Sequence, residues 1–274
     1  MKDKVVVITG AGGVLCSTIA KAYAKKGAKV AVLDLKLESA QKVVDEIVNA
    51  GGIAKAYAVN CLEKKTMEEA KEKINKELGK CDILVNGAGG NHPKGTTTSE
   101  YFNAADVDDE AKISFFDLDE NGVDFVFKLN FLATFLTTQV FAKDMVGRGG
   151  IILNISSMNA FRPLTKIPAY SGAKASVSNF TQWLAVHFAQ EGIRVNAIAP
   201  GFFVTNQNRA LLFDAEGNPT ARTNKILAGT PMRRFGEPEE LLGTVMWLSD
   251  NDASGFVTGI VVPIDGGFSA YSGV

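Results

Sequence analysis

The sequence predicts a doubly wound α/β fold, in which helices cover both faces of a parallel sheet. Short β-branched runs alternate with longer amphipathic stretches along the chain, which is the pattern of successive strand–helix–strand units. A glycine-rich turn, Gly10-Ala-Gly-Gly13, joins the first strand to the first helix. No repeat, low-complexity tract or linker divides the 274 residues, so we expect a single domain, 1–274, with about seven strands.

Composition and charge exclude several classes of protein. With 46% hydrophobic and 22% charged residues, the chain has an ordinary globular composition. Its net charge of −1 gives no bulk attraction to nucleic acid or to an anionic membrane, and we expect neither as a partner. We expect no signal peptide, because the chain enters a strand at residue 4, and we expect no membrane span, because no apolar run approaches the ~18 residues that span a bilayer.

The number and spacing of the cysteines indicate the redox compartment in which the protein works. Cys16, Cys61 and Cys81 are scattered and odd in number, and they fit neither a disulfide framework nor a zinc site. We therefore expect no bound metal, and we expect the reducing environment of the cytoplasm.

The beginning of the chain has the form of a dinucleotide-binding unit. It consists of a strand at 4–9, a glycine turn at 10–13, a helix at 14–26 and a strand at 29–34. Glycines let a backbone approach a pyrophosphate, and a helix N-terminus offers it free N–H groups. The residues expected to bind the dinucleotide here are Thr9, Gly10, Gly12, Gly13, Val14 and Leu15. A plain strand-to-helix turn is the alternative.

Asp34 ends the second strand, where an acidic side chain takes the ribose hydroxyls of such a cofactor. A carboxylate at this position repels the 2′-phosphate of NADP, and no arginine stands beside it. We therefore predict NAD(H) as the cofactor. A surface aspartate at a strand end is the alternative.

The remaining elements continue the alternation. Further strands are expected at 53–59, 83–86, 150–155, 193–199 and 258–264, and further helices at 36–50, 63–78, 123–145, 168–191 and 237–249. The polar segment 91–122 has weak periodicity and leaves the carboxyl end of a strand, the ligand side of a parallel sheet. We expect it to form part of the wall of a substrate pocket, with an ornamental surface insertion as the alternative.

Ser157, Tyr170 and Lys174 carry the chemistry that the sequence suggests. Tyr170 and Lys174 are four residues apart, so a helix places them on one face. The ammonium favours the phenolate and is expected to lower a phenol pKa that is ordinarily near ~10. Ser157 follows an apolar strand and adds a hydroxyl beside the phenol, and the three groups together can move a proton on or off an alcohol oxygen. A tyrosine–lysine pair alone is weak evidence, because many such pairs lie in solvent.

The spacing resembles the active-site signature of the short-chain dehydrogenase/reductase family, in which a serine precedes the tyrosine by thirteen positions. The resemblance extends over nearly the whole chain, through Thr9-Gly10, Asn86-Gly-Ala-Gly89 and Pro200-Gly-Phe-Phe-Val-Thr205. It implies a Rossmann domain that transfers a hydride between a nicotinamide and a carbonyl or secondary alcohol. It also implies a homotetramer, and it makes Ser157, Tyr170, Lys174 and Asn130 the catalytic residues, with Asn130 helping to hold a water of a proton relay.

The resemblance assigns further cofactor contacts and a flap over the substrate at 206–229. The contacts that it adds are Asn60, Cys61, Asn86, Gly87, Ala88, Gly89, Tyr170, Lys174, Pro200, Gly201, Phe203 and Thr205. Val14 and Cys16 depart from the family pattern, which has glycines there, and Gly87 replaces a second asparagine. A β-branched residue such as Val14 resists positive φ, so we expect an altered pose of the pyrophosphate.

The polar residues around the expected pocket suggest the substrate. They are His92, Asn159, Arg162 and Arg209, with Lys94 and Lys166 nearby. Cationic and amide side chains suit a small, polyhydroxylated anion such as a sugar acid, whereas a steroid or acyl chain needs apolar walls.

Three stretches resemble one branch of the family, whose members reduce D-fructuronate to D-mannonate. They are Gly12-Gly-Val-Leu-Cys16, Gly89-Gly-Asn-His-Pro93 and Ser157-Met-Asn-Ala-Phe161. This resemblance implies that pair of sugar acids as substrate and product. The alternatives are another reductase of the family, such as an NADPH-dependent 3-oxoacyl or gluconate-type enzyme, and a non-catalytic dinucleotide-binding regulatory protein.

Overall fold

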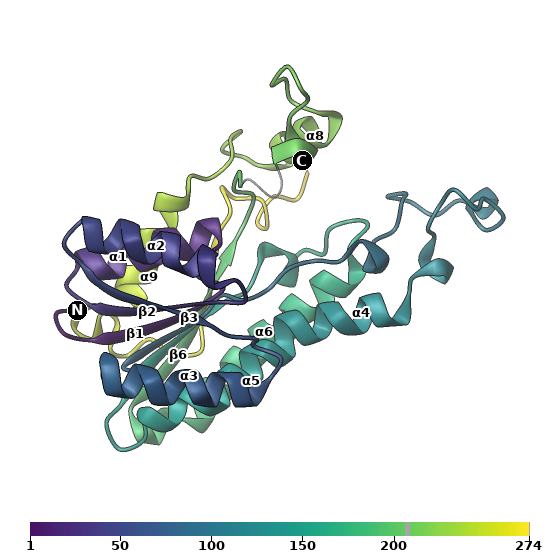
Figure 1. Cartoon of the computed structure of the whole chain (residues 1–274). Helices are drawn as coiled ribbons and strands as arrows, with labels where there is room; N and C mark the ends of the chain where they lie inside the picture. The colour runs from purple at the N-terminus through teal and green to yellow at the C-terminus, as the bar shows by residue number, and fades with distance from the viewer. Residues whose placement is uncertain (206–208, 274) are drawn as a thin grey trace.

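The computed structural model describes residues 1–205 and 209–273, and its centre is a parallel sheet (Figure 1). Within the described residues the sheet has seven strands in the order β3-β2-β1-β4-β5-β6-β7. The strands are β1 (Val5–Thr9), β2 (Lys29–Asp34), β3 (Ile53–Ala58), β4 (Ile83–Asn86), β5 (Gly150–Ile155), β6 (Ile193–Pro200) and β7 (Val261–Ile264). Every neighbouring pair is parallel, which confirms the predicted fold class.

Helices cover both faces of this sheet. They are α1 (Val14–Lys25), α2 (Leu37–Asn49), α3 (Lys64–Glu77), α4 (Glu120–Phe127), α5 (Ala133–Phe141), α6 (Pro168–His187), α7 (Arg209–Leu212), α8 (Ala221–Gly229), α9 (Leu242–Leu248) and α10 (Asn251–Ser254). One apolar core joins the sheet to α1, α2 and α9, and a second joins it to α3, α5 and α6 (Figure 1). Because both faces are covered, the central strands are continuous apolar runs.

The order of the strands fixes the position of a binding crevice. The chain fills one half of the sheet from β1 to β3 and then returns to β4, which lies on the other side of β1. The loops after β1 and β4 therefore diverge from one another at the carboxyl ends of the strands. Open parallel sheets bind ligands at such a switch point.

The helix predicted at 123–145 begins earlier and is irregular in its middle. A π-helical turn, η4 (Lys128–Leu132), separates α4 from α5, and a 3₁₀ turn, η5 (Ala142–Asp144), follows α5. By length and composition this helical run, Glu120–Asp144, could cross a membrane, so the prediction that no apolar segment reaches such a length is wrong. Half of its most apolar window is buried inside the protein, as in a core helix.

The segment predicted to line a pocket, 91–122, contains three short 3₁₀ turns and then enters α4. The turns are η1 (Pro93–Gly95), η2 (Ala104–Asp106) and η3 (Phe115–Asp117). Its middle part projects away from the sheet at the upper right of Figure 1. At its base, Thr97 N donates to Lys166 O at 2.9 Å, and Glu100 forms an ion pair with Lys225 of α8 at 2.8 Å. These contacts join the segment to the approach to α6 and to the region predicted as a flap.

The other predicted boundaries agree with the structure within a few residues, with three exceptions. The helix predicted at 237–249 begins as a 3₁₀ turn, η8 (Pro238–Leu241), and continues as α9. The last strand begins at Val261 rather than at residue 258, because Gly259 adopts a positive φ of 83° and interrupts extended backbone. The helix predicted at 168–191 ends at His187 and is followed by a 3₁₀ turn, η7 (Ala189–Glu191). Of the predicted flap, 206–208 lie outside the described residues, and the remainder holds α7 and α8.

Candidate active site

The turn after β1 and the turn after β4 are bonded to each other. The hydroxyl oxygen of Thr9 accepts hydrogen bonds from Gly87 N at 3.1 Å and from Ala88 N at 3.2 Å. Gly10 has a φ of 63°, and a Cβ there would lie 2.9 Å from the Cα of Ala88. A glycine is therefore required at this position both by the backbone conformation and by the close approach of the second turn.

The N-terminus of α1 is open to an anion. Gly13 precedes the helix in an extended conformation and makes no side-chain cap. The first N–H groups of the helix, beginning at Val14 and Leu15, have no carbonyl acceptor within it. This is the arrangement that binds a pyrophosphate, so the residues present fit a dinucleotide.

Val14 does not strain this loop. It is the first residue of α1, and it is not among the residues with positive φ, whereas Gly10 is. The β-branched side chain therefore does not force a strained backbone here, and the altered pose of the pyrophosphate stays a prediction. The left-handed position of the loop lies four residues earlier, where a glycine is present.

Asp34 is held against the glycine loop. Its Oδ2 accepts from Gly12 N at 3.0 Å, and its Oδ1 accepts from Lys36 N at 3.1 Å. A Cβ on Gly12 would lie 2.8 Å from Asp34 Oδ2 and 2.6 Å from the Cβ of Ser39. The carboxylate therefore has a fixed orientation at the edge of the crevice, where it presents a negative charge beside the expected ribose site.

Ser157, Tyr170 and Lys174 converge at the carboxyl end of β5. Tyr170 and Lys174 lie in the first turns of α6, and the Nζ atom of Lys174 is 5.7 Å from the centroid of the Tyr170 ring. Lys174 Nζ also donates to Ile155 O, the last residue of β5, at 2.8 Å. Ser157 is the N-cap of the 3₁₀ turn η6 (Met158–Ala160), and its hydroxyl interacts with the phenol of Tyr170.

The protonation of this group differs from the sequence prediction. Burial raises the pKa of the Tyr170 phenol, and the hydrogen bond with Ser157 lowers it only in part. Burial also lowers the pKa of Lys174 to about 8. The net direction for Tyr170 is opposite to the predicted one, because loss of solvent from the phenol outweighs the stabilisation of its anion. Tyr170 is thus held protonated, in the form that can donate a proton.

Asn130 connects the turn after β4 to the irregular helix. It is fully buried in the π-helical turn, and its Nδ2 donates to Gly90 O at 2.7 Å and to Val126 O at 2.8 Å. Its Oδ1 accepts from Gly90 N at 3.2 Å. A Cβ on Gly89 would lie 2.6 Å from Asn130 Oδ1 and 3.1 Å from Lys174 Nζ, so the bare backbone of Gly89 lies against both side chains.

Two of the predicted cofactor residues have side chains that are occupied elsewhere. Asn86 is buried, and its Nδ2 donates to Asn154 Oδ1 at 2.8 Å and to Thr138 at 3.0 Å, which ties β4 to β5 and α5. Asn60 donates to Glu63 at 2.7 Å and accepts from Leu62 N at 3.1 Å within its own turn.

Cys61, the neighbour of Asn60, is buried, and burial raises the pKa of its thiol to about 11. Cofactor contacts of Asn86, Asn60 and Cys61 remain predictions.

The predicted stretch Pro200 to Thr205 leaves β6 towards the flap. Gly201 N donates to Ile264 O at 2.9 Å, and a Cβ on Gly201 would lie 2.6 Å from the Cα of Asp265. Phe203 packs its ring into the apolar core, so a cofactor contact from it would come from the backbone. The carbonyl of Thr205 accepts from the backbone N–H of Arg209 at 3.0 Å.

The predicted substrate residues are only partly brought together. Asn159 is buried two residues after Ser157, its N–H donates to the Ser157 hydroxyl at 3.2 Å, and its Oδ1 has no hydrogen-bond partner among the described residues. His92 Nδ1 accepts from Lys94 N at 3.2 Å, which leaves Nε2 as the protonated nitrogen of the neutral ring.

The predicted cations are engaged elsewhere. Lys94 pairs with Asp119 at 3.3 Å, and Arg162 Nε donates to Ser269 O at 3.1 Å. The guanidinium of Arg209 lies 5.4 Å from the centroid of the Phe213 ring. Lys166 contributes its backbone carbonyl to the base of the 91–122 segment.

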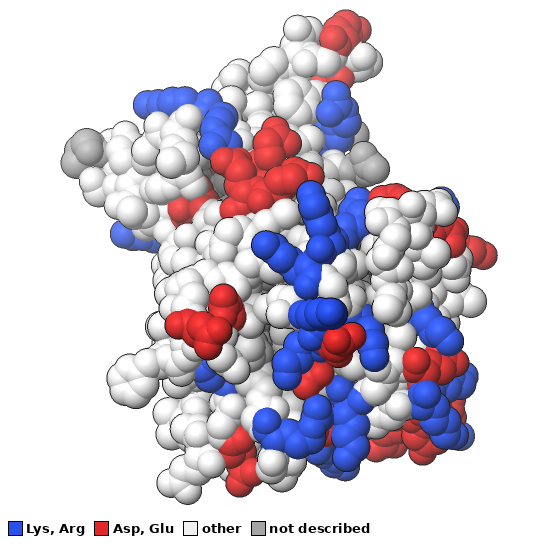
Figure 2. Space-filling model, turned by 90° about the vertical axis from the view of Figure 1, so that its left-hand side faces the viewer, with Lys and Arg blue, Asp and Glu red and all other residues white. Residues whose placement is uncertain are grey.

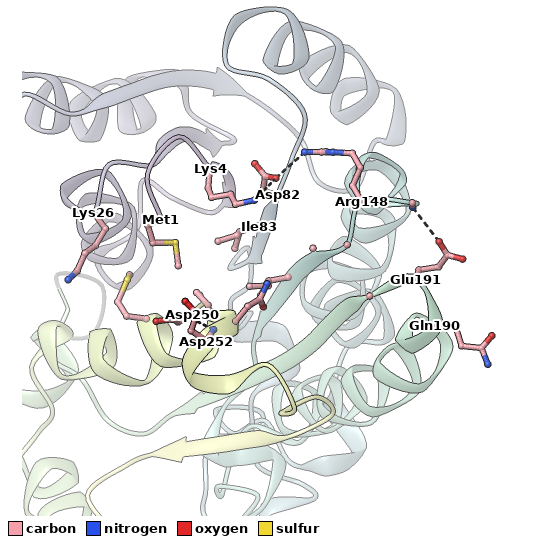
Figure 3. Close-up of a pocket in the computed structure, with 18 residues that line it drawn as sticks. Met1, Lys4, Lys26, Asp82, Ile83, Arg148, Gln190, Glu191, Asp250 and Asp252 are labelled. Carbon is pink, nitrogen blue, oxygen red and sulfur yellow. Dashed lines mark hydrogen bonds and ion pairs between the residues drawn. The ribbon is translucent and has the colours of Figure 1, made fainter.

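A hollow of about 1010 Å³ lies at the other end of the strands and is not this site (Figure 3). Figure 2 views the molecule from that end, the left of Figure 1, and shows Lys and Arg side chains gathered in a band down its centre. In the hollow, Asp82 pairs with Lys4 at 3.4 Å and with Arg148 at 3.0 Å. Its opposite charges neutralise each other, and it contains none of the predicted site residues.

The sequence did not predict that backbone groups of Gly90 and Ile155 would bind the side chains of the site. Gly90 bonds to Asn130 through both its N–H and its carbonyl, and Ile155 O accepts from Lys174. The signal for Gly90 is its place in the glycine-rich turn 87–90 after β4, where a close backbone approach is expected. No sequence signal identifies Ile155. The residues that the structure describes contain no group of three or more metal-ligating side chains.

Comparison with known proteins finds similarity along the whole chain. The family model of the short chain dehydrogenases matches residues 4–215. An oxidoreductase of Haemophilus influenzae, itself uncharacterized, is 61% identical over 100% of this chain and 96% of its own length. The uncharacterized oxidoreductase UxuB of Bacillus subtilis is 54% identical over 100% of this chain and 98% of its own length.

A crystal structure of a protein from Haemophilus influenzae, with bound NAD, superposes with a TM-score of 0.96. It has 60% sequence identity and covers 100% of this chain and 98% of its own. That protein carries the provisional name D-mannonate oxidoreductase.

Proposed function

Because this chain belongs to the short-chain dehydrogenase family, we propose that it is an NAD(H)-dependent oxidoreductase that interconverts a keto sugar acid and its secondary alcohol. The substrate pair that we infer is D-fructuronate and D-mannonate. The observation that carries the proposal is the convergence of Ser157 and Lys174 on Tyr170 beside the two bonded turns of the crevice. We propose that segment 91–122 and the described part of the predicted flap, 209–229, serve as walls of the substrate pocket.

The side chains of the site have separate roles in reduction. Tyr170, held protonated by burial, donates a proton to the substrate oxygen. Ser157 positions that oxygen by hydrogen bonding, and Lys174 supplies positive charge near the phenol once the proton has left. Asn130 fixes the turn against which Lys174 lies. When bound, the nicotinamide exchanges a hydride with the substrate carbon.

The residues proposed to hold the dinucleotide come from several loops. The open helix end at Val14 takes the pyrophosphate, and Asp34 takes the ribose hydroxyls at the adenine end. The turn Gly87–Gly89 and the residues after β6 enclose the nicotinamide end. The structure with NAD from the Haemophilus influenzae relative supports this choice of cofactor.

The negative charge of Asp34 provides a test of the cofactor choice. Asp34→Asn keeps an oxygen that can accept from Gly12 N but removes the charge that repels a 2′-phosphate. Two like unit charges about 4 Å apart repel each other by about 4 kcal/mol at an effective dielectric constant of about 20, before solvent and salt screen the repulsion. We expect the ratio of kcat/KM for NADPH to that for NADH to rise by roughly 10- to 100-fold, since each 1.4 kcal/mol is tenfold. An unchanged ratio contradicts the role given to Asp34.

The polar residues beside the catalytic group support a sugar acid as the substrate. Asn159 brings close to Ser157 a buried carbonyl oxygen that has no partner among the residues the structure describes, and such an acceptor suits a substrate hydroxyl. His92 keeps Nε2–H available as a donor. The provisional name of the Haemophilus influenzae relative points to the same class of compound.

An assay of NADH oxidation tests the substrate directly. The protein is incubated with D-fructuronate and NADH, in parallel with 5-ketogluconate and an acyl-thioester control, and absorbance is followed. We expect turnover with fructuronate and at least about tenfold lower kcat/KM with the others, because a site with buried polar groups rejects ligands that leave them unpaired. Turnover with the thioester alone removes the sugar-acid proposal, and NADH binding without any turnover favours a regulatory protein.

We also propose that the enzyme is a cytoplasmic homotetramer. Trp183 is 56% exposed and Val186 is 81% exposed on α6, beside a row of stacked aromatic rings that includes Phe180 and His187. An exposed apolar face of this kind favours subunit contact. Light scattering that gives the mass of one chain at micromolar concentration contradicts the assembly.

A further inference from the structure

Two departures from the family pattern, Cys16 and Gly87, are in contact although they are far apart in the sequence. Cys16 is buried in the first turn of α1, and Gly87 directly follows β4. A Cβ built on Gly87 would overlap the Sγ of Cys16, while it would lie at an ordinary 3.6 Å from the Cβ of Cys16. The sulfur atom therefore occupies the space that a side chain at position 87 would need.

We propose that Cys16 and Gly87 form a complementary steric pair that sets the position of the turn 87–90 and, through it, of Lys174 and Asn130. Both are positioning residues, since neither is required to touch the reacting atoms. The inference deepens the proposed function and depends on it for the roles of Lys174 and Asn130. The family pattern has a glycine at position 16 and an asparagine at position 87, whereas this chain has a cysteine and a glycine there, so the larger of the two side chains is at position 16.

A displacement of Gly87 can reach Lys174 and Asn130 because the turn 87–90 is held in place on several sides. Its first residues donate to Thr9, and Gly87 O would lie 3.0 Å from a Cβ on Gly10. At its far end, Gly89 lies against Asn130 Oδ1 and Lys174 Nζ. Three of its four residues are glycines, so it has no flexible side chains that could absorb a displacement.

The sulfur acts as a spacer rather than as a nucleophile. Burial raises the pKa of the Cys16 thiol to about 12, and the nearby charge of Lys174 offsets this only in part. The thiol is thus neutral at physiological pH, and neutral thiols react slowly with electrophiles. What Cys16 contributes to the site is volume.

A double-mutant cycle isolates the contact. The variants are Cys16→Ala, Gly87→Ala and the double variant, and the measurements are the NADH dissociation constant by fluorescence, kcat with fructuronate and the urea midpoint of unfolding. A Cβ at position 87 also lies 2.7 Å from Thr9 O, but this contact is the same in both backgrounds and cancels in the cycle.

We expect Gly87→Ala alone to weaken NADH binding and to lower kcat by about tenfold or more, and Cys16→Ala alone to have a smaller effect. In the double variant, removal of the sulfur is expected to restore part of both quantities. Additive effects of the two changes, or a Gly87→Ala variant that matches the native protein, overturn the inference. If Gly87→Ala fails to fold, recovery of folded protein in the double variant supports the pair, and failure of that recovery contradicts it.

Thiol reactivity gives a readout that a general loss of stability does not reproduce. Cys16, Cys61 and Cys81 are all buried and free, so the native protein should react slowly with dithiobis(nitrobenzoate). In folded Gly87→Ala we expect one rapidly reacting thiol, which disappears in the double variant. Gly243→Ala is the matched control, because a Cβ there meets nothing within 4 Å. Absence of any new reactive thiol in Gly87→Ala counts against displacement of Cys16.

These measurements separate the inference from the proposed function. If no sugar acid is turned over, the substrate proposal fails, while the cycle can still be read from NADH affinity, unfolding and thiol reactivity. If the cycle is additive while fructuronate is reduced normally, the steric pair fails and the proposed function stands.

Discussion

Replacing Tyr170 by phenylalanine is expected to lower kcat for the proposed reduction of fructuronate by roughly 10²- to 10⁴-fold, the range associated with loss of a general acid. The hydroxyl is the only group that the change removes, and the structure holds it protonated beside Ser157. The ring itself still packs against α4 and Lys174, so NADH should bind with nearly its native affinity. Stopped-flow or steady-state kinetics, together with a fluorescence titration of NADH, measure both quantities.

A matched control is available at Tyr57. Its hydroxyl donates to Glu77 at 2.7 Å near the outer edge of the sheet, away from the crevice, so Tyr57→Phe removes a hydroxyl without touching the site. We expect that variant to lose a little stability, about 1 kcal/mol for a hydrogen bond, and to retain its activity. Near-native turnover in the Tyr170 variant would falsify the assignment of the proton donor.

Gly89→Ala is expected to have the second largest effect. The added Cβ would lie 2.6 Å from Asn130 Oδ1 and 3.1 Å from Lys174 Nζ, so at least one of these side chains must move. A displacement of about 1 Å in a positioned catalytic group can lower the rate by about 100-fold. We therefore expect kcat to fall by at least tenfold, with a smaller change in the urea midpoint.

The control for this glycine is again Gly243→Ala, which places the same methyl group in open space on α9. A second comparison, Lys174→Ala, shows how far kcat falls when the amine is removed completely. If Gly89→Ala keeps native kcat and native NADH affinity, the close contact among Gly89, Asn130 and Lys174 has no part in catalysis.

Features that depend on short stretches of sequence could be predicted well. The strand Lys29–Asp34 has the predicted bounds, because an apolar run with a glycine two residues before it leaves little choice of boundaries. The Ser157, Tyr170 and Lys174 group could be located because the spacing of Tyr170 and Lys174 fixes their shared helix face. Sequence and structure therefore agree where one element determines the geometry by itself.

Features that depend on contacts between distant segments could not be predicted. The irregular turn at Asn130 depends on hydrogen bonds to Gly90, forty residues away. The direction of the pKa shift of Tyr170 depends on how much solvent the folded protein removes, which the spacing to Lys174 does not reveal. The sequence shows that Val14 and Cys16 depart from the family pattern. Only the structure shows that Cys16 packs against Gly87, the other position that departs from the pattern.

The hydrogen bond between Arg162 and Ser269 has a practical consequence for expression of the protein. It fastens the last residues of the chain next to η6, and Phe268 packs on Phe202, so the described C-terminus lies on the catalytic side of the molecule. The N-terminus lies on the opposite side (Figure 1). An affinity tag for purification is therefore better joined to the amino end, because a peptide joined to the carboxyl end would leave the described residues on the same side of the molecule as Ser157, Tyr170 and Lys174.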